Sequence, residues 1–312
     1  MQRCLVTGGA GFIGSHLVDG LLSAGHSVKV FDDLSTGQAT NLPAGIECIN
    51  GTVADLSALT AAAEDCTHIY HLAAMASVAM SLEDPLGCHA ACATGTLNAL
   101  QAARAVGAMR IVYAASSSCY GPAADPAGLD ENTPLRPLSP YAAAKLAGEH
   151  YLESFASSYD IETVRLRFFN IFGPRQRADS PYSGVIAIFT GLLSAGRTPV
   201  VHGDGLQGRD FTYVANAVRA VIKGGSTPGI SGRVYNVGTG RMVNLLELVQ
   251  ALNHTMGTSI VPQHGPERVG DVRFSLAKID KIKAELNYEP MVSFEDGLKH
   301  TVDWYRAGGT GR

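Results

Sequence analysis

A glycine-rich turn between a short apolar strand and a helix constrains this chain more than any other segment. Residues 3–6 are predicted to form a buried strand, and Thr7-Gly8-Gly9-Ala10-Gly11-Phe12-Ile13-Gly14 follows it, with glycines at positions 8, 11 and 14. Leucines at helical spacing then lead to a second strand over 27–31, which ends on Asp32. This order of strand, glycine turn, helix, strand and acid predicts a dinucleotide-binding βαβ unit.

The chemistry of that unit follows from its residue types. Glycines let backbone amides approach a pyrophosphate, and the N-terminus of the helix offers partial positive charge. Asp32 can accept hydrogen bonds from a ribose diol, whereas a 2′-phosphate at the same place would meet a carboxylate. We therefore predict NAD, and not NADP, as the cofactor.

The rest of the chain alternates strands and helices. Strands are predicted at 46–50, 67–72, 110–115 and 162–169, and helices near 55–64, 83–107 and 139–159. This alternation predicts an α/β fold with a Rossmann-like, doubly wound parallel sheet. After Gly173 the segments become shorter and mixed, which predicts a smaller α/β domain. We expect an NAD-binding domain over 1–170 and a second domain over 171–312, and leave open that part of 211–240 rejoins the first.

A second group of polar residues lies on either side of a loop. The apolar run at 111–115 ends on Ser116-Ser117-Ser118, and Ser139-Pro140 opens a helix that places Tyr141 and Lys145 on one face. A phenol, an ammonium and several hydroxyls would then meet at the end of a strand. Such a group can remove a proton from an alcohol while another group takes the hydride.

Composition and charge exclude several other classes of protein. The net charge is −4 and long basic runs are absent, which argues against nucleic acid and anionic membranes as partners. The chain has neither an apolar signal segment nor an apolar span of 18 residues, so we expect a cytoplasmic protein. Cys88 and Cys92 share a helix face without histidines at metal spacing, and we predict no metal site.

These motifs together resemble the extended short-chain dehydrogenase/reductase superfamily. Within it the sequence is similar to the UDP-hexose 4-epimerases, particularly those that act on UDP-N-acetylglucosamine. The resemblance covers nearly the whole chain. Besides the glycine turn, it rests on His71-Leu72-Ala73-Ala74, Ser116-x-x-x-Tyr120-Gly121, Tyr141-x-x-x-Lys145, Arg167-Phe168-Phe169-Asn170, Gly173-Pro174-Arg175-Gln176, Arg209-Asp210-Phe211 and Arg268-Val269-Gly270-Asp271.

The resemblance implies roles for particular residues. Tyr141 would be the base for the sugar 4-hydroxyl, Lys145 would bind the nicotinamide ribose and lower the pKa of the tyrosine, and Ser116 would relay the proton. The implied cofactor contacts are Gly8, Gly11, Phe12, Ile13, Gly14, Asp32, Asp33, Leu72, Ala73, Ala74, Tyr141, Lys145 and Phe168. The implied substrate contacts are Ser117, Ser118, Asn170, Gly184, Val185, His202, Arg209, Arg268, Asp271 and Ser275.

The reaction implied is an NAD-dependent 4-epimerisation of UDP-sugars through a transient 4-keto sugar, and the oligomeric state implied is a homodimer.

Two departures from the family pattern leave cofactor contacts open. The family often has Gly-Asp where this chain has Gly51-Thr52, at the adenine end, and often has Asn where Cys92 stands.

Three rival activities use the same scaffold. A 4,6-dehydratase needs an acid–base pair where this chain has Ser117-Ser118, a UDP-glucuronate decarboxylase usually places Glu at the Ser118 position, and a UDP-glucuronate 4-epimerase usually has Thr at the Asn170 position. A non-catalytic NAD-binding regulator would be expected to lose Tyr141 or Lys145. These positions favour the epimerisation of neutral hexoses.

The position of Ser275 favours an acetamido sugar. In related epimerases this position lines the pocket at the 2-substituent of the sugar, where a tyrosine excludes an acetamido group and a small residue admits it. We therefore predict turnover of UDP-N-acetylglucosamine and UDP-N-acetylgalactosamine, with UDP-glucose and UDP-galactose as poorer substrates. An ordinary surface serine remains the alternative at this position.

Overall fold

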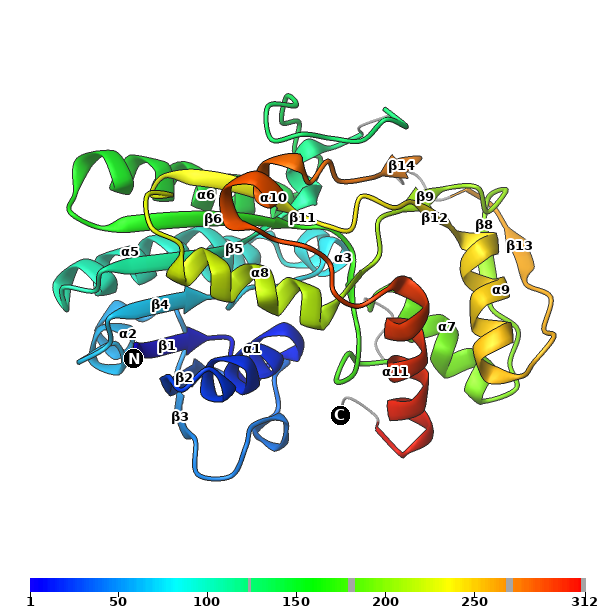
Figure 1. Cartoon of the computed structure of the whole chain (residues 1–312), viewed down its shortest axis with the longest axis horizontal. Helices are drawn as coiled ribbons and strands as arrows, with labels where there is room; N and C mark the ends of the chain where they lie inside the picture. The colour runs from blue at the N-terminus through cyan, green and yellow to red at the C-terminus, as the bar shows by residue number, and fades with distance from the viewer. Residues whose placement is uncertain (123–124, 179–182, 268–271, 310–312) are drawn as a thin grey trace.

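The computed structural model of this chain describes residues 1–122, 125–178, 183–267 and 272–309. Its centre is a sheet of seven strands in the order β11-β6-β5-β4-β1-β2-β3, and every neighbouring pair is parallel (Figure 1). The strand order reverses between β1 and β4, which confirms the predicted doubly wound fold. The strands are β1 (Arg3–Thr7), β2 (Ser27–Asp32), β3 (Glu47–Asn50), β4 (His68–His71), β5 (Arg110–Ser116), β6 (Glu162–Phe168) and β11 (Arg233–Val237).

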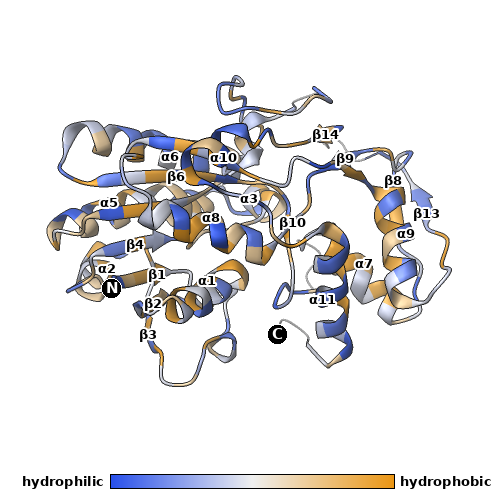
Figure 2. Ribbon diagram, in the orientation of Figure 1, coloured by the Kyte–Doolittle hydropathy of each residue, from blue (hydrophilic) through white to orange (hydrophobic). Residues whose placement is uncertain are grey.

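Helices cover both faces of this sheet. On one face α1 (Phe12–Ser23) packs beside α8 (Val214–Ser226), and on the other α5 (Gly95–Ala105) lies between α2 (Leu56–Ala62) and α6 (Pro140–Ser158). Side chains along each strand alternate between the two layers because successive residues of a strand point to opposite faces. Figure 2 shows that apolar and hydrophilic residues are interspersed along the central strands. Val30, Tyr70 and Val112 belong to the first layer, and Phe31, Ile69 and Ile111 belong to the second.

The C-terminal half adds a smaller group of elements beside the sheet (Figure 1). Its helices are α7 (Val185–Ser194), α9 (Leu245–Met256) and α11 (Phe294–Arg306), while α10 (Asp280–Leu286) packs on β11. Phe172, Phe189 and Leu248 share one hydrophobic core with the sheet. Among its short strands, β9 (Gly208–Arg209) pairs with both β12 (Val243–Asn244) and β14 (Phe274–Ser275). Strand β13 (Gln263–Gly265) pairs with β8 (Val200–His202), and β10 (Thr212–Tyr213) pairs with β7 (Ile171–Phe172).

The helix predicted near 83–107 is confirmed, with a π-helical turn inside it. Its residues form α4 (Pro85–His89), the π-helical turn over Ala90–Thr94 and α5, which follow one another without a gap. A separate short helix, α3 (Val78–Glu83), comes before it. Proline cannot continue a helix because it lacks the amide hydrogen, so the break falls at Pro85. The Asp84 side chain caps the new helix by accepting a hydrogen bond from the Gly87 amide at 2.8 Å. In the part of the chain that the structure describes, none of the helices is long and apolar enough to cross a membrane.

The predicted start of the 139–159 helix is confirmed. The Ser139 hydroxyl accepts a hydrogen bond from the Ala142 amide at 3.1 Å, and Pro140 is the first helical residue. Its missing amide hydrogen costs nothing there because the first turn has no carbonyl partner for it. Helix α6 therefore begins one residue before Tyr141, and its first turns lie over the end of β5.

Candidate active site

The glycine turn joins β1 to α1 at the point where the strand order reverses. Gly8 has φ +70°, and a side chain on Gly14 would place its Cβ 2.0 Å from the Gly8 carbonyl oxygen. A Cβ on Gly8 would lie 2.7 Å from the Ala73 amide nitrogen, so the turn also touches the segment after β4. This close-packed backbone precedes a helix whose N-cap is a glycine without a side-chain acceptor. The turn fits the pyrophosphate of NAD, because a phosphate can approach its amides and the helix N-terminus.

Asp32 ends β2 beside this turn. Its side chain is buried, with Oδ2 accepting the Ala10 amide at 2.9 Å and Oδ1 accepting the Leu34 amide at 2.9 Å. Burial raises the pKa of this carboxyl, while the two amides act in the opposite direction. Asp32 therefore also holds the glycine turn in place. Asp33 is exposed, and its carboxylate accepts hydrogen bonds from the Ser35 amide and hydroxyl.

A buried hydrogen-bond chain links β1, β4 and α5 next to Leu72, Ala73 and Ala74. Thr7 Oγ1 lies 2.7 Å from Nδ1 of His71, and Nε2 of His71 lies 3.1 Å from Thr96 Oγ1. Burial lowers the pKa of His71 to about 3, so the ring is neutral. The Thr7 hydroxyl also accepts the Ala73 amide at 3.3 Å. Thr7 and His71 lie in motifs recognised in the sequence, but the sequence assigned neither residue a role. Their contacts show that they hold the carboxyl ends of β1 and β4 together.

The predicted catalytic residues meet at the carboxyl end of β5. Ser116 is the last residue of that strand, and the ammonium of Lys145 donates to the Ala114 carbonyl oxygen at 2.8 Å. The same ammonium lies 4.7 Å from the centre of the Tyr113 ring. Burial raises the pKa of Tyr141, and a hydrogen bond with the Ser116 side chain acts to lower it. Burial lowers the pKa of Lys145. The Ser116 hydroxyl, the Tyr141 phenol and the Lys145 ammonium thus lie at the same strand end. Burial by itself disfavours the phenolate form of Tyr141.

The serine cluster after β5 is internally hydrogen-bonded. Ser118 donates to Ser116 Oγ through its hydroxyl at 2.9 Å and through its amide at 3.2 Å. Ser116 Oγ is therefore held by two donors. Its own hydrogen remains available to Tyr141 or to a substrate oxygen.

Two thiols pack against Tyr141, and one of them, Cys92, stands at the position where the resemblance leads us to expect an asparagine. Cys88 and Cys92 are fully buried in a cluster with Ala144 and Tyr141. Burial raises the pKa of Cys88 to about 12, so it is a neutral thiol at this face. Over the described residues, no three His, Cys, Asp or Glu side chains gather as metal ligands would.

Several predicted substrate residues lie together around a small cavity of about 70 Å³. Asn170 adopts φ +29°, and its Nδ2 donates to the Asp210 carbonyl oxygen at 3.2 Å. Gly184 is the N-cap of α7 and offers no side chain to its first amides. Phe168 ends β6 opposite Ser116. The residues that line the cavity are Asn170, Ile171, Phe172, Gln176, Gly184, Val185, Ile186 and Phe211.

Arg209 and Ser275 are neighbours on two paired strands. Strand β9 pairs with β14 in a register that places Arg209 opposite Ser275, and the Asp210 amide donates to the Ser275 carbonyl oxygen at 2.7 Å. Arg268 and Asp271 lie outside the described residues. The imidazole Nδ1 of His202 lies 3.0 Å from the Pro266 carbonyl oxygen. The structure therefore brings Ser275 beside one of the two predicted diphosphate arginines.

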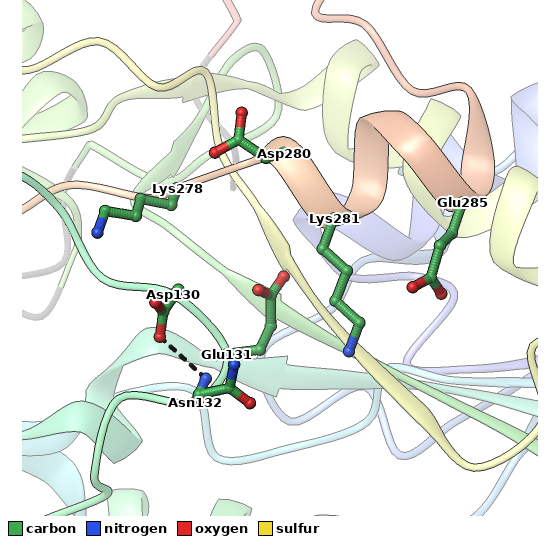
Figure 3. Close-up of a pocket in the computed structure, with 7 residues that line it drawn as sticks. All are labelled: Asp130, Glu131, Asn132, Lys278, Asp280, Lys281 and Glu285. Carbon is green, nitrogen blue, oxygen red and sulfur yellow. Dashed lines mark hydrogen bonds between the residues drawn. The ribbon is translucent and has the colours of Figure 1, made fainter.

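A larger, polar cavity of about 360 Å³ lies elsewhere, between the loop after Leu129 and α10 (Figure 3). Four carboxylates and two lysines line it with one amide, and these residues come from the loop on one side and from α10 and the segment before it on the other. Its residues are Asp130, Glu131, Asn132, Lys278, Asp280, Lys281 and Glu285, none of which was predicted as a site residue.

Comparison with known proteins identifies the family. Residues 4–238 match the NAD dependent epimerase/dehydratase family. A UDP-glucose 4-epimerase of Mycolicibacterium smegmatis is 39% identical, over 98% of this chain and 99% of that protein. The chain therefore belongs to the NAD dependent epimerase/dehydratase family, whose members are extended short-chain dehydrogenase/reductases. This confirms the resemblance read from the motifs, and NAD as the cofactor.

Two solved structures are especially similar. A UDP-glucose 4-epimerase of Thermotoga maritima, solved with UDP-glucose, has a TM-score of 0.94 and 36% identity, and the match covers 98% of this chain and 99% of that one. A UDP-N-acetylglucosamine 4-epimerase of Methanobrevibacter ruminantium, solved with UDP-N-acetylmuramic acid, has a TM-score of 0.93 and 34% identity at the same coverage. Both similarities extend over the whole fold, so they include the sheet and the C-terminal elements.

Proposed function

We propose that this chain is an NAD-dependent 4-epimerase of UDP-sugars that interconverts UDP-N-acetylglucosamine and UDP-N-acetylgalactosamine. Its similarity to 4-epimerases along the whole chain supports the reaction class. The observation that carries the choice of sugar is the place of Ser275. This small residue lies beside Arg209, the proposed diphosphate ligand, and therefore near where the sugar follows the diphosphate.

In the proposed mechanism Tyr141 accepts the proton of the sugar 4-hydroxyl while hydride leaves C4. Lys145 holds the nicotinamide ribose, and Ser116 donates a hydrogen bond to the reacting oxygen. NAD, when bound, accepts and returns the hydride, and its positive charge favours the phenolate that burial disfavours. Rotation of the 4-keto sugar about its diphosphate then presents the opposite face to the returning hydride. Holding the reactants in register is the main contribution of the protein.

Most cofactor residues named from the resemblance lie at or just after the carboxyl ends of four strands, β1, β2, β4 and β6. The glycine turn with Phe12 and Ile13 would take the pyrophosphate, and Asp32 with Asp33 would take the adenosine ribose. Leu72, Ala73 and Ala74 would lie along the cofactor, and Phe168 would lie near the nicotinamide. The contact of Gly8 with the Ala73 amide supports this set, because it joins two of these segments.

Most of the residues proposed to contact the substrate come from the C-terminal half. The uncapped amides at Gly184 and Val185 and the guanidinium groups of Arg209 and Arg268 would hold the diphosphate. Ser117, Ser118 and Asn170 would contact the sugar, and His202 and Asp271 the uridine. We propose the corresponding division into an NAD-binding domain, 1–170, and a nucleotide-sugar-binding domain, 171–312, with β11 and α8 as later segments that complete the sheet layer.

The substrate choice predicts the effect of one substitution. Ser275→Tyr is expected to lower kcat/KM for the two N-acetylated substrates by about 100-fold, because the larger ring would fill the space of the acetamido group. UDP-glucose and UDP-galactose should be turned over as well as before, or better. The measurement is kcat/KM for all four UDP-sugars, with products identified by NMR.

Ser275→Ala is the matched control and should leave the substrate ratio nearly unchanged. An unchanged ratio of acetylated to plain substrate in the tyrosine variant would remove Ser275 from the pocket. If the wild-type enzyme converts only UDP-glucuronate, the proposed substrate is wrong.

We also propose a homodimer that forms through α3, α4 and α6. Val78, Leu82 and Leu86 are 45%, 65% and 81% exposed on α3 and α4, and Tyr151 of α6 is 39% exposed. Both short helices pack against α6, so these side chains belong to one side of the molecule. Exposed large apolar side chains gathered in this way are typical of a protein interface.

The variant Leu82→Glu/Leu86→Glu is therefore expected to be a monomer, because two carboxylates would have to be desolvated in the interface. Light scattering coupled to size exclusion measures the mass. Met291→Glu, at a residue that is 69% exposed and lies before α11, should remain dimeric. A wild-type protein that is monomeric at micromolar concentration would exclude the interface.

A further inference from the structure

A buried ion pair joins α6, the helix that carries Tyr141 and Lys145, to the central sheet. Glu149 of α6 and Arg167 of β6 are 1% and 3% exposed. Arg167 Nη2 lies 2.7 Å from Glu149 Oε2, and Arg167 Nε donates to Oε1 at 2.9 Å and to Oε2 at 3.1 Å. Two parallel hydrogen bonds of this kind fix the relative orientation of the two side chains as well as their separation.

The pair is the start of a longer polar network. Arg167 Nη1 donates to the Tyr120 hydroxyl at 2.9 Å, and that hydroxyl donates to Asn236 Oδ1 at 2.7 Å. Asn236 in turn donates through Nδ2 to the Leu129 carbonyl oxygen at 2.9 Å. The network therefore connects α6 and β6 to the turn after β5, to β11 and to the loop over 129–131. Of these segments, α6, β6 and the turn after β5 carry proposed site residues.

The network lies on the face of α6 that carries the site. Tyr141, Lys145 and Glu149 are spaced by four residues, so they lie along one side of the helix. Lys145 fastens this side to β5 through the Ala114 carbonyl oxygen, and Glu149, one turn later, fastens it to β6 through Arg167. Two attachments on neighbouring strands fix the rotation of α6 about its axis, which a single one would not do.

We propose that Glu149 and Arg167 are positioning residues for the reaction: their ion pair holds α6 in the rotation that directs Tyr141 and Lys145 toward the cofactor and the sugar, and keeps the buried charge near them balanced. This proposal rests on the roles proposed above for Tyr141 and Lys145. It assigns a function to two buried residues that contact neither ligand in the proposed mechanism.

The charge balance follows from what surrounds the two catalytic residues. The titratable groups that face them are Cys88 and Cys92 from the segment before α5, Cys119 after β5, Tyr113 of β5, His71 of β4, and Glu149 itself with Arg167. Burial raises the pKa of Cys88, Cys119 and Tyr113 and lowers the pKa of His71, so these four groups are neutral. Removing the Glu149 carboxylate would therefore leave Arg167 as an unbalanced cation beside the site.

The test compares Glu149→Gln, Arg167→Met and the double variant. Glu149→Gln keeps the shape of the side chain but should lower kcat at least tenfold and weaken NAD binding about tenfold, because α6 loses its buried ion pair with β6. The acid limb of the kcat–pH profile should move to lower pH by about half a unit, because an unbalanced cation favours the Tyr141 phenolate. The double variant should return the acid limb to its wild-type position and regain part of the urea midpoint lost in either single variant.

Glu153→Gln is the matched control. Glu153 pairs with Arg165 at 3.0 Å and so joins the same helix to the same strand, but its side chain is 58% exposed. It should leave kcat, NAD affinity and the acid limb unchanged. Glu149→Gln with wild-type kcat, NAD affinity and pH profile, but a lower urea midpoint, would reduce the pair to a purely structural role.

A failure of the catalytic roles proposed for Tyr141 and Lys145 can be distinguished from a failure of the role proposed for the ion pair. If Tyr141→Phe remains active, the proposed base is wrong. The urea midpoints and NAD affinities of the Glu149 and Arg167 variants still report whether the pair sets the position of α6. If the two single losses add in the double variant, the pair is not coupled and the proposal is overturned.

Discussion

Tyr141→Phe is expected to lower kcat by about 10³- to 10⁴-fold, because the variant removes the only group proposed to take the proton of the 4-hydroxyl. The ring itself is kept, so packing against Cys88, Cys92 and Ala144 should be preserved. Stability and NAD affinity should therefore stay close to those of the wild type. Single-turnover formation of the 4-keto sugar, followed by the absorbance of the reduced cofactor, isolates the chemical step.

Tyr151→Phe is the matched control for this variant. Tyr151 lies on the same helix ten residues later and is 39% exposed, so losing its hydroxyl should not change kcat. Turnover of Tyr141→Phe within tenfold of the wild type would show that another group accepts the proton. Ser116 would then be the first candidate, because its side chain is hydrogen-bonded to Tyr141.

Gly14→Ala is expected to abolish measurable NAD binding and to destabilise the protein by about 3 kcal/mol or more. The added Cβ would lie 2.0 Å from the Gly8 carbonyl oxygen and 2.8 Å from the Gly9 Cα. Both are backbone atoms, so the turn would have to move as a whole. Because the turn also contacts the Ala73 amide, its displacement would spread to the end of β4. Isothermal titration with NAD and urea denaturation measure the two effects.

Gly11→Ala is the control within the same turn. The closest atom to its Cβ would again be the Gly8 carbonyl oxygen, but at 3.2 Å, so a shift of a few tenths of an ångström relieves it. Its unfolding free energy should fall much less than that of Gly14→Ala. Equal losses in the two variants would mean that the contact with Gly8 is not what requires a glycine at position 14.

The sequence was sufficient for the local elements of the nucleotide-binding half. Strand β1, the glycine turn and Asp32 at the end of β2 all lie where their pattern predicted, because buried parallel strands and a glycine turn leave short-range signals. The N-cap of α6 could be predicted equally well, because Ser139 and Pro140 are adjacent in the chain to the helix that they start. The helix predicted near 83–107 was found as well, but neither the π-helical turn over Ala90–Thr94 inside it nor the short helix α3 before it was predicted.

Motif order also identified the family, and with it NAD and the residue types of the site. It did so because the cofactor turn and the Tyr141–Lys145 pair are each built from residues close together in the chain. The contacts of His71 and Asp32 were not readable, although both residues stood in recognised motifs. Their partners, Thr96, Ala10 and Leu34, had no sequence signal that marked them as such.

What the sequence by itself determined is therefore everything carried by neighbours in the chain: the strands, the glycine turn, the capped helix and the chemistry of its first turns. Only the tertiary structure decided which distant segments meet. Strand order placed Gly8 against Ala73, strand register placed Arg209 opposite Ser275, and helix packing placed Glu149 on Arg167. Such pairings depend on the packing of the whole chain, since a residue pattern fixes which side of an element is buried but not which element covers it.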